Sequence, residues 1–150
     1  MKKMDKWIIG LLIVSLLIIS ACSSSQQYSR QSATIYKSPT CGCCVGYSGH
    51  LKSAGFEVIK KDTNAMDEIH KKYNIPPDME SCHTVIIGDY FVEGHVPIEV
   101  VDKLLEEKPD IDGISLPRMP SGSPGMPGPK RGLWTIYALK DGKTSEFMVI

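Results

Sequence analysis

The chain has 150 residues, and its 17 basic and 17 acidic side chains give a formal net charge of zero. No basic patch or long run of Lys and Arg follows the N-terminal segment, so the composition gives no support to a nucleic-acid-binding protein. About 117 residues, 34–150, are available for folding, which is enough for one domain with a modest core.

The N-terminal segment has the features of an export signal. Three lysines within residues 2–6 precede an apolar stretch over residues 7–19. These 13 residues are too few for a membrane span, which needs about 20, but they suit the apolar part of a secretory signal. Residues 19–22 resemble the bacterial lipobox, whose cysteine, here Cys22, becomes lipid-modified and forms the new N-terminus. A plain signal peptide or a short anchor helix is the alternative interpretation.

These features predict three segments, which are a lipoprotein signal peptide over 1–21, a flexible tether over 22–33 and a folded domain over 34–150. The tether starts from the lipidated Cys22 and is rich in Ser and Gln, which favours disorder. We therefore expect an extracytoplasmic protein that is lipid-anchored to a bacterial membrane. Removal of the signal leaves a mature chain with a net charge of about −2.

Hydrophobic periodicity and turn residues predict a single α/β domain. The expected strands cover residues 34–37, 56–60, 84–87, 90–93, 133–139 and 145–150, and the expected helices cover residues 42–54, 65–73 and 97–107. The resulting order, β-α-β-α-β-β-α followed by a C-terminal hairpin, is similar to that of a thioredoxin-like fold. Residues 109–132 are rich in Pro, Gly and Ser, and they include Met119 and Met126. An irregular loop of this length is usually functional or mobile.

Three thiols, Cys41, Cys43 and Cys44, lie where the first expected strand is followed by the first helix. The unpaired N–H groups and the partial positive charge at a helix N-terminus stabilise a thiolate there. A thiolate is the nucleophile in disulfide exchange and also a ligand for soft metals, so the position alone leaves both chemistries open. Exchange needs only Cys41 and Cys44. Cys43 would compete in exchange, whereas in a metal site it can bridge two ions.

A fourth thiol, Cys82, directly precedes the third expected strand and is followed by His83. In thioredoxin-like proteins this position faces the cysteine pair and often holds a cis-proline. Its replacement by Cys and His argues against an ordinary disulfide exchanger. The alternatives are that Cys82 is a small buried hydrophobic side chain and that His83 lies on the surface. His50 and His70 fall within expected helices, and we expect both to be solvated.

Four stretches of the sequence, residues 36–44, 81–84, 92–97 and 119–126, match the pattern of a known family. Together they resemble the predicted metal-binding proteins typified by the bacterial copper-resistance protein CopG, over nearly all of residues 34–150. The resemblance implies a thioredoxin-like domain that binds copper outside the cytoplasm and contributes to copper tolerance. It also implies the copper ligands, with Cys41, Cys43, Cys44 and Cys82 as the main set and Met119, Met126 and, more weakly, His95 as supporting ligands.

The ligand types agree with copper as the bound metal. Thiolate and thioether sulfur select Cu(I), and clustered thiolates can hold more than one ion. Three or four thiolates would also suit Zn(II), but thioether is a poor zinc ligand, so the two loop methionines favour copper. The alternatives are that a loop methionine is only an apolar cover and that His95 only supports the helix that follows it.

Three functional classes are compatible with these residues. The first is a copper-binding lipoprotein that holds Cu(I) for copper resistance or homeostasis, with other copper-resistance proteins as partners. The second is a thiol-disulfide or copper-dependent oxidoreductase of thioredoxin-like fold. The third is a structural domain whose cysteines form disulfides. The first class accounts best for Cys43, and whether the protein is an enzyme is left open.

Overall fold

The computed structural model describes residues 31–150. The expected signal peptide, most of the expected tether and the lipidation site at Cys22 lie outside the described residues and stay predictions. Among residues 31–150, no helix is both long enough and apolar enough to cross a membrane.

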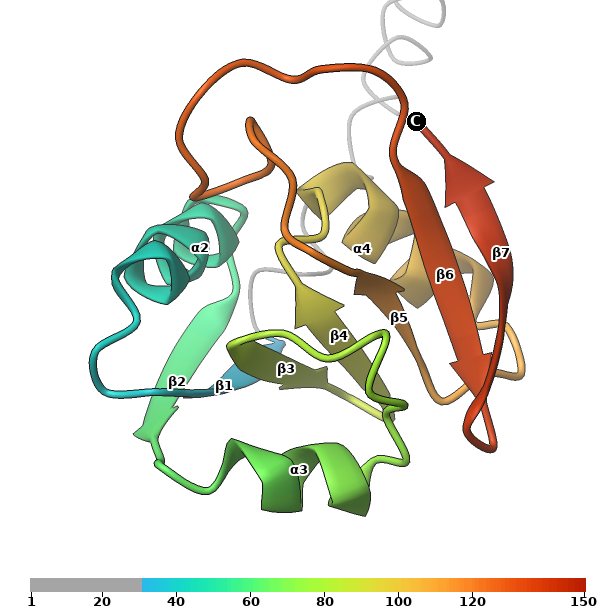
Figure 1. Ribbon diagram of the computed structural model, residues 1–150, viewed down its shortest axis with the longest axis horizontal. Coiled ribbons are helices and arrows are strands. Elements are labelled where there is room, and N and C mark those ends of the chain that lie inside the picture. The colour runs from blue at the N-terminus through green and yellow to red at the C-terminus, as the bar shows by residue number, and fades with distance from the viewer. Residues whose placement is uncertain (1–30) are drawn as a thin grey trace, which may run out of the picture.

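The described residues form a mixed α/β domain in which three helices pack on one seven-stranded sheet of order β2-β1-β3-β4-β5-β6-β7 (Figure 1). The strands are β1 (Ser32–Lys37), β2 (Glu57–Asp62), β3 (His83–Ile87), β4 (Tyr90–Gly94), β5 (Gly113–Leu116), β6 (Thr135–Lys140) and β7 (Lys143–Val149). The helices are α2 (Gly42–Ser53), α3 (Met66–Lys72) and α4 (Ile98–Glu107).

Two parallel strand pairs are each connected by a helix. Strands β1 and β2 are joined by α2, and strands β4 and β5 are joined by α4. Strand β3 lies antiparallel to both β1 and β4, and β6 and β7 extend the sheet as an antiparallel hairpin. Lys37 at the end of β1 lies opposite His83 at the start of β3. The end of β1, the start of α2 and the start of β3 therefore meet at one end of the strands.

Side-chain alternation along the strands separates two apolar layers. Val85 of β3 and Val92 of β4 belong to the main core, to which α2 contributes Tyr47 and α4 contributes Val101. Phe91, next to Val92 in the sequence, points to the opposite face and belongs to a smaller cluster formed with the segment that follows α3. Burial of both layers removes apolar surface from water, and this is the main stabilising contribution to the fold.

The predicted α/β single domain is confirmed, and each expected helix and strand is present with small shifts at its ends. The expected irregular loop over 109–132 is wrong in one part, because residues 113–116 form strand β5. All four residues of β5 are buried, so the strand lacks the alternation of polar and apolar side chains that marks a half-buried strand. Gly113 is required by close packing, since a Cβ there would overlap the carbonyl of Phe91.

Candidate metal centre

Four cysteine sulfurs converge where the end of β1 and the start of β3 lie side by side. Cys41 is the N-cap of α2, and Cys43 and Cys44 lie in the first turn of that helix. Cys82 immediately precedes β3. Because β1 and β3 are antiparallel neighbours, Cys82 reaches three cysteines that are 38 to 41 residues away in the sequence.

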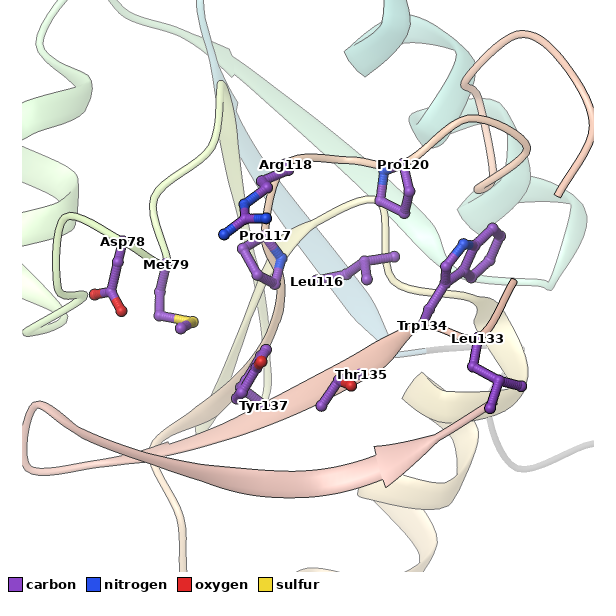
Figure 2. Close-up of a pocket in the computed structure, with 10 residues that line it drawn as sticks. All are labelled: Asp78, Met79, Leu116, Pro117, Arg118, Pro120, Leu133, Trp134, Thr135 and Tyr137. Carbon is purple, nitrogen blue, oxygen red and sulfur yellow. The ribbon is translucent and has the colours of Figure 1, made fainter. Parts of the chain in front are cut away.

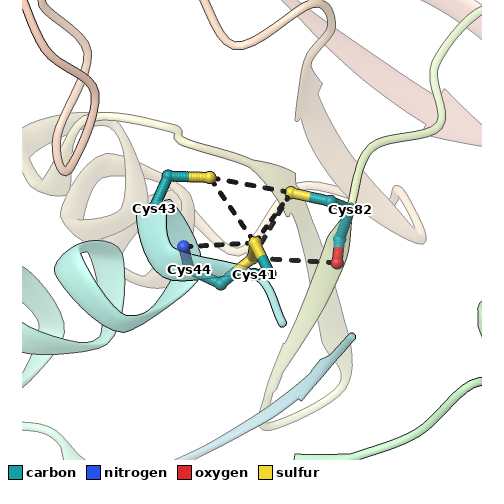
Figure 3. Close-up of side chains that lie close together, drawn as sticks. All are labelled: Cys41, Cys43, Cys44 and Cys82. Atoms are coloured by element: carbon teal, nitrogen blue, oxygen red, sulfur yellow. Dashed lines mark hydrogen bonds between the residues drawn. A yellow bond between two sulfur atoms is a disulfide. The ribbon is translucent and has the colours of Figure 1, made fainter. Parts of the chain in front are cut away.

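The four sulfur atoms lie within 4.8 Å of one another. The Sγ atom of Cys82 is 3.2 Å from that of Cys41, 3.3 Å from that of Cys44 and 4.0 Å from that of Cys43 (Figure 3). The Sγ atoms of Cys41 and Cys43 are 3.5 Å apart. Cys44 is buried and the other three are partly exposed, so an ion held between them would be shielded from water on the side of the core.

The cluster is in a half-oxidised form. Cys41 and Cys44 are joined by a disulfide, with Cα atoms 5.4 Å apart, and Cys43 and Cys82 are free thiols. Reduction of the disulfide takes up two electrons and two protons and makes all four sulfurs available as ligands. The Cys82 sulfur lies 3.2–3.3 Å from both sulfurs of the disulfide, so the same arrangement also allows thiol-disulfide exchange.

The two sides of the cluster differ in electrostatics. On the α2 side, the backbone N–H of Cys44 donates to the Sγ atom of Cys41 at 3.3 Å, and the helix N-terminus favours negative charge. On the β3 side, burial raises the pKa of Cys82 to about 12, with a further contribution from Cys43. Without a cation, Cys82 is therefore a protonated thiol at neutral pH, and a bound metal ion would displace that proton.

Of the two loop methionines, Met119 reaches the cluster, with its Sδ atom 3.6 Å from the Sγ atom of Cys82. Arg118 and Met119 have positive backbone φ values of 64° and 43°. Residues other than Gly rarely adopt such values, and they recur at functional sites. Within residues 31–150, no sulfur contact of this kind involves Met126. Its backbone N–H donates to the carbonyl of Ser123 at 2.8 Å, and its expected role as a ligand stays a prediction.

His83 and His95 lie next to Cys82, and both are fully buried. Their ring centroids are 4.8 Å apart, and the ring of Tyr47 from α2 packs against both, at 5.0 Å and 5.2 Å. The Nδ1 atom of His83 is 3.9 Å from the Sγ atom of Cys82. The alternative that His83 lies on the surface is wrong, because His83 points to the same face of β3 as Val85, which belongs to the main core.

Both of these imidazoles are neutral at physiological pH. Burial, together with the neighbouring His95, lowers the pKa of His83 to about 3. Burial also lowers the pKa of His95, although its hydrogen bond with the carbonyl of Pro124 partly opposes that shift. The neutral imidazole is the form that binds a metal ion, because it has a free nitrogen lone pair.

The segment between β5 and β6 packs against α2 (Figure 1). Gly125, with φ +84°, packs so closely on α2 that a Cβ there would lie 2.6 Å from the backbone nitrogen of Tyr47. The carbonyl of Pro124 accepts a hydrogen bond from the Nδ1 atom of His95 at 2.6 Å. This segment therefore contributes Met119 to the cluster and also holds His95.

The buried carboxylate of Glu93 supports the chain on both sides of Cys82, and this role was not predicted from the sequence. Glu93 of β4 is fully buried and accepts hydrogen bonds from the backbone N–H of Ser81 at 2.5 Å and from the hydroxyl of Thr84 at 2.6 Å. Because these two residues flank Cys82 and His83, Glu93 fixes the backbone that carries both. A single Glu within the apolar strand β4 is the signal in the sequence that could have indicated this role.

The expectation that His70 is solvated is wrong. His70 of α3 is buried, and its Nε2 atom lies 3.3 Å from the carboxylate of Glu93. Burial by itself lowers the pKa of His70, but the hydrogen bond and charge of Glu93, with additions from Glu80 and Asp67, raise it overall. Helical periodicity could not reveal this position, because the partner carboxylate comes from a strand that is distant in the sequence. The expectation that His50 is solvated agrees with its exposed position on α2.

A surface pocket of about 380 Å³ lies beside residues 116–120, the part of the chain that contains Met119 (Figure 2). Arg118 and Pro120, the neighbours of Met119 in the sequence, contribute to its lining, together with Trp134 and Tyr137 at the start of the C-terminal hairpin. None of the lining residues is a cysteine or a histidine. The pocket is therefore separate from the sulfur cluster and adjoins it through the backbone of Met119.

The fold and the site together define a mixed α/β domain with a sulfur-rich centre able to bind a metal ion. Two solved structures of a copper resistance protein are similar to this chain. "Copper resistance protein copG- Form 2" is 33% identical, with a TM-score of 0.74 over 81% of this chain and 98% of that chain. "Copper resistance protein copG- Form 1" is 34% identical, with a TM-score of 0.72 over 79% of this chain and 96% of that chain.

The chain therefore belongs to the family of the copper resistance protein CopG, and the resemblance noted in the sequence is confirmed. The family described as "Protein of unknown function, DUF411" matches residues 79–126, a range that contains Cys82, His83, His95 and Met119. A search of the curated proteins found no match.

Proposed function

We propose that this protein is an extracytoplasmic copper-binding lipoprotein that holds Cu(I) through Cys41, Cys43, Cys44 and Cys82 and serves copper resistance or homeostasis. The observation that carries the proposal is the convergence of four sulfur atoms within 4.8 Å from two distant segments of the chain. The names of the two similar structures support copper as the metal. We assign the domain to the thioredoxin-like folds on the order of its first seven elements.

The donor atoms fit copper in its reduced state. Thiolate sulfur is a soft ligand that selects Cu(I), and Met119 adds a thioether next to Cys82. Bound Cu(I) would neutralise thiolate charge that is otherwise costly in this partly buried position, and binding would release the proton that Cys82 holds. Cys43 lies between Cys41 and Cys44 in the sequence, and its thiolate can bridge neighbouring ions. We therefore propose that the site holds more than one Cu(I).

Uptake of Cu(I) by the reduced full-length chain, measured without oxygen, tests this function against a Cys43→Ser variant. We expect tight uptake by the native chain and weaker uptake by the variant, because Cys43 is a ligand in the copper site but has no part in a Cys41–Cys44 disulfide. If neither protein retains copper and both exchange the Cys41–Cys44 disulfide normally, the copper function is wrong.

A thiol-disulfide or copper-dependent oxidoreductase is the second candidate. The Cys41–Cys44 disulfide with the Cys82 thiol beside it favours this candidate, because such contact is what exchange requires. Cys82 and His83 stand where ordinary thioredoxin-like exchangers often have a proline, and for that reason we place this candidate second.

The membrane anchor is proposed from the sequence around Cys22. Incorporation of a labelled fatty acid into the native chain, and its loss in a Cys22→Ser variant, would support the anchor. Equal labelling of both chains, or labelling of neither, would contradict it. We propose other copper-resistance proteins as partners that supply or receive the metal, and copper transfer to or from a co-purifying protein would test this.

A further inference from the structure

The surface pocket beside residues 116–120 has the composition of a small ligand site. Three of its lining side chains, Met79, Leu116 and Trp134, are more than nine-tenths buried and apolar. Arg118 and Asp78, which are both exposed, add one charge of each sign. A volume of about 380 Å³ lies within the usual range for ligand pockets, about 300–1,000 Å³, and such pockets likewise combine apolar walls with a few polar groups.

Trp134 brings an unpaired hydrogen-bond donor to this pocket. Its Nε1 atom is buried and has no hydrogen bond among residues 31–150. The atom lies on the edge of the indole ring that faces Leu116 and Pro120, two other lining residues (Figure 2). The ammonium of Lys130, 4.6 Å from the ring centroid, is itself a donor and cannot pair with it. Native proteins rarely leave a buried donor unpaired without a reason, so we look to the pocket for the acceptor.

The position of Trp134 is fixed by the C-terminal end of the chain. Its backbone N–H donates to the carbonyl of Ile150 at 2.9 Å, and its carbonyl accepts from the N–H of Ile150 at 3.0 Å. Its ring belongs to the main core. The indole N–H is therefore held in place before a ligand arrives, which lowers the entropic cost of binding.

Arg118 supplies a second donor group, and this one is charged. Its side chain forms no ion pair within residues 31–150 and extends across the pocket toward Met79 (Figure 2). A guanidinium only donates, and its planar fork matches the two oxygens of a carboxylate. Asp78 lies at the end of the pocket away from Trp134, so a second negative charge on the ligand is disfavoured there (Figure 2).

We propose that this pocket binds the carboxy-terminal residue of a peptide, where that residue has an apolar side chain. The terminal carboxylate accepts hydrogen bonds from the guanidinium of Arg118. The peptide carbonyl before it accepts from the Nε1–H of Trp134, and the apolar side chain packs on Met79 and Leu116. Both donor groups of the pocket then have an acceptor, and the ligand carries the charge opposite to that of Arg118. A carboxylic acid without a peptide carbonyl would leave the indole N–H unpaired.

The pocket lies next to the chain that carries the thioether of the metal centre. Arg118 and Pro120 are the direct neighbours of Met119, whose Sδ atom contacts Cys82. A partner protein that docks through its C-terminus would therefore be held beside the metal centre, and this role of the pocket rests on the proposed copper function. Peptide binding itself needs no copper, so its test uses the metal-free chain and can fail or succeed separately from copper binding.

Titration of the metal-free full-length chain with N-acetyl-L-phenylalanine tests the pocket, because this probe has a carboxylate, a peptide carbonyl and an apolar ring. The chain has two tryptophans, so in a Trp7→Phe variant the indole N–H signal in NMR spectra belongs to Trp134 alone. We expect this signal to shift as the new hydrogen bond forms. The amide of the probe lacks the charge, and 3-phenylpropionate lacks the peptide carbonyl. Each should bind about tenfold more weakly than the probe, since each loses one hydrogen-bonded group.

Arg118→Gln should lower the affinity for N-acetyl-L-phenylalanine about tenfold and leave the affinity for its amide unchanged. Arg131→Gln is the matched control, because Arg131 is exposed on the same stretch between β5 and β6 but does not line the pocket. Trp134→Phe keeps an apolar ring and removes the donor. It should therefore weaken the binding of N-acetyl-L-phenylalanine and leave that of 3-phenylpropionate unchanged, as followed by the NMR signals of the probes.

An indole signal that does not move, equal affinity for the acid and its amide, or undiminished binding by Arg118→Gln would overturn the pocket. Arg118 is exposed, so this variant gives a measurement even if Trp134→Phe fails to fold. Binding of 3-phenylpropionate as tight as that of N-acetyl-L-phenylalanine would overturn the peptide as the ligand and assign the pocket to free carboxylic acids.

Discussion

The Sδ atom of Met119 lies 3.6 Å from the Sγ atom of Cys82, although 37 residues separate them in the sequence. Strand β3 runs antiparallel to β4, and β4 runs parallel to β5. The start of β3 and the end of β5 therefore lie at the same end of the sheet, and the residue before β3 meets the segment after β5. This topology adds a thioether to a cluster of thiols.

Met119→Leu should leave the fold intact and weaken Cu(I) binding by about tenfold, the lower end of what loss of a supporting partner of a metal site commonly costs. Leu has nearly the same volume as Met, and such exchanges usually change the free energy of unfolding by less than about 1.5 kcal/mol. The substitution removes only the thioether sulfur. Competition with a Cu(I) chelator measures the effect, and Met126→Leu is the control, since Met126 makes no sulfur contact with the cluster in the described residues. A larger loss of affinity in Met126→Leu would assign the thioether role to the other methionine.

Copper binding should depend on the oxidation state of the Cys41–Cys44 pair. Cys43 and Cys82 are the two free thiols within residues 31–150, and reduction should raise the number of reactive thiols there to four. We expect the oxidised chain to bind less Cu(I). The two sulfurs of the disulfide carry no thiolate charge and are therefore poor ligands, which leaves only two of the four sulfurs to bind the metal. Thiol titration and copper analysis on the same samples check this. Equal copper content in both forms would show that Cys41 and Cys44 are not ligands.

The free energy of unfolding of the metal-free chain should include a contribution from His70 that decreases as the pH rises above 6.5. The folded pKa of His70 is raised above its unfolded value, chiefly by Glu93 acting against burial. This contribution is therefore complete below the unfolded pKa and is lost as the pH rises through the folded pKa. Urea unfolding at a series of pH values measures it. The decrease should become smaller in Glu93→Gln, and an unchanged pH dependence in that variant would contradict the assignment.

Gly125→Ala should destabilise the domain more than Gly132→Ala. Both glycines have a positive φ, +84° and +71°, so both substitutions carry the backbone penalty of a non-glycine residue. A Cβ at Gly125 would also lie 2.6 Å from the backbone nitrogen of Tyr47, whereas no atom lies within 4 Å of the corresponding position at Gly132. We expect a loss of about 1–3 kcal/mol for Gly125→Ala and a smaller loss for Gly132→Ala. Thermal or urea unfolding measures the stability of both variants. Equal losses of stability would show that the chain at Gly125 does not pack closely on α2.

Much of the fold could be predicted because its elements are encoded locally. Periodicity and turn residues indicated the helices and six of the strands, and the position of Cys41, Cys43 and Cys44 followed from the end of one strand and the start of one helix. Strand β5 could not be predicted in this way, because its four residues are all buried and lie within a Pro/Gly-rich stretch. Within the loop that was expected there, residues 113–116 form a strand, and the segment that follows packs on α2.

By itself, the sequence determined that this is an α/β domain with three thiols at a helix N-terminus and with a thiol and an imidazole before a later strand. Only the tertiary structure decided which of these residues meet. Cys82 joins the other cysteines because β1 and β3 are antiparallel neighbours with Lys37 opposite His83. The burial of His83, the ion pair of His70 with Glu93 and the approach of Met119 depend on strand pairing between distant segments. Local patterns describe each segment separately, whereas the metal centre is a property of the contacts between segments.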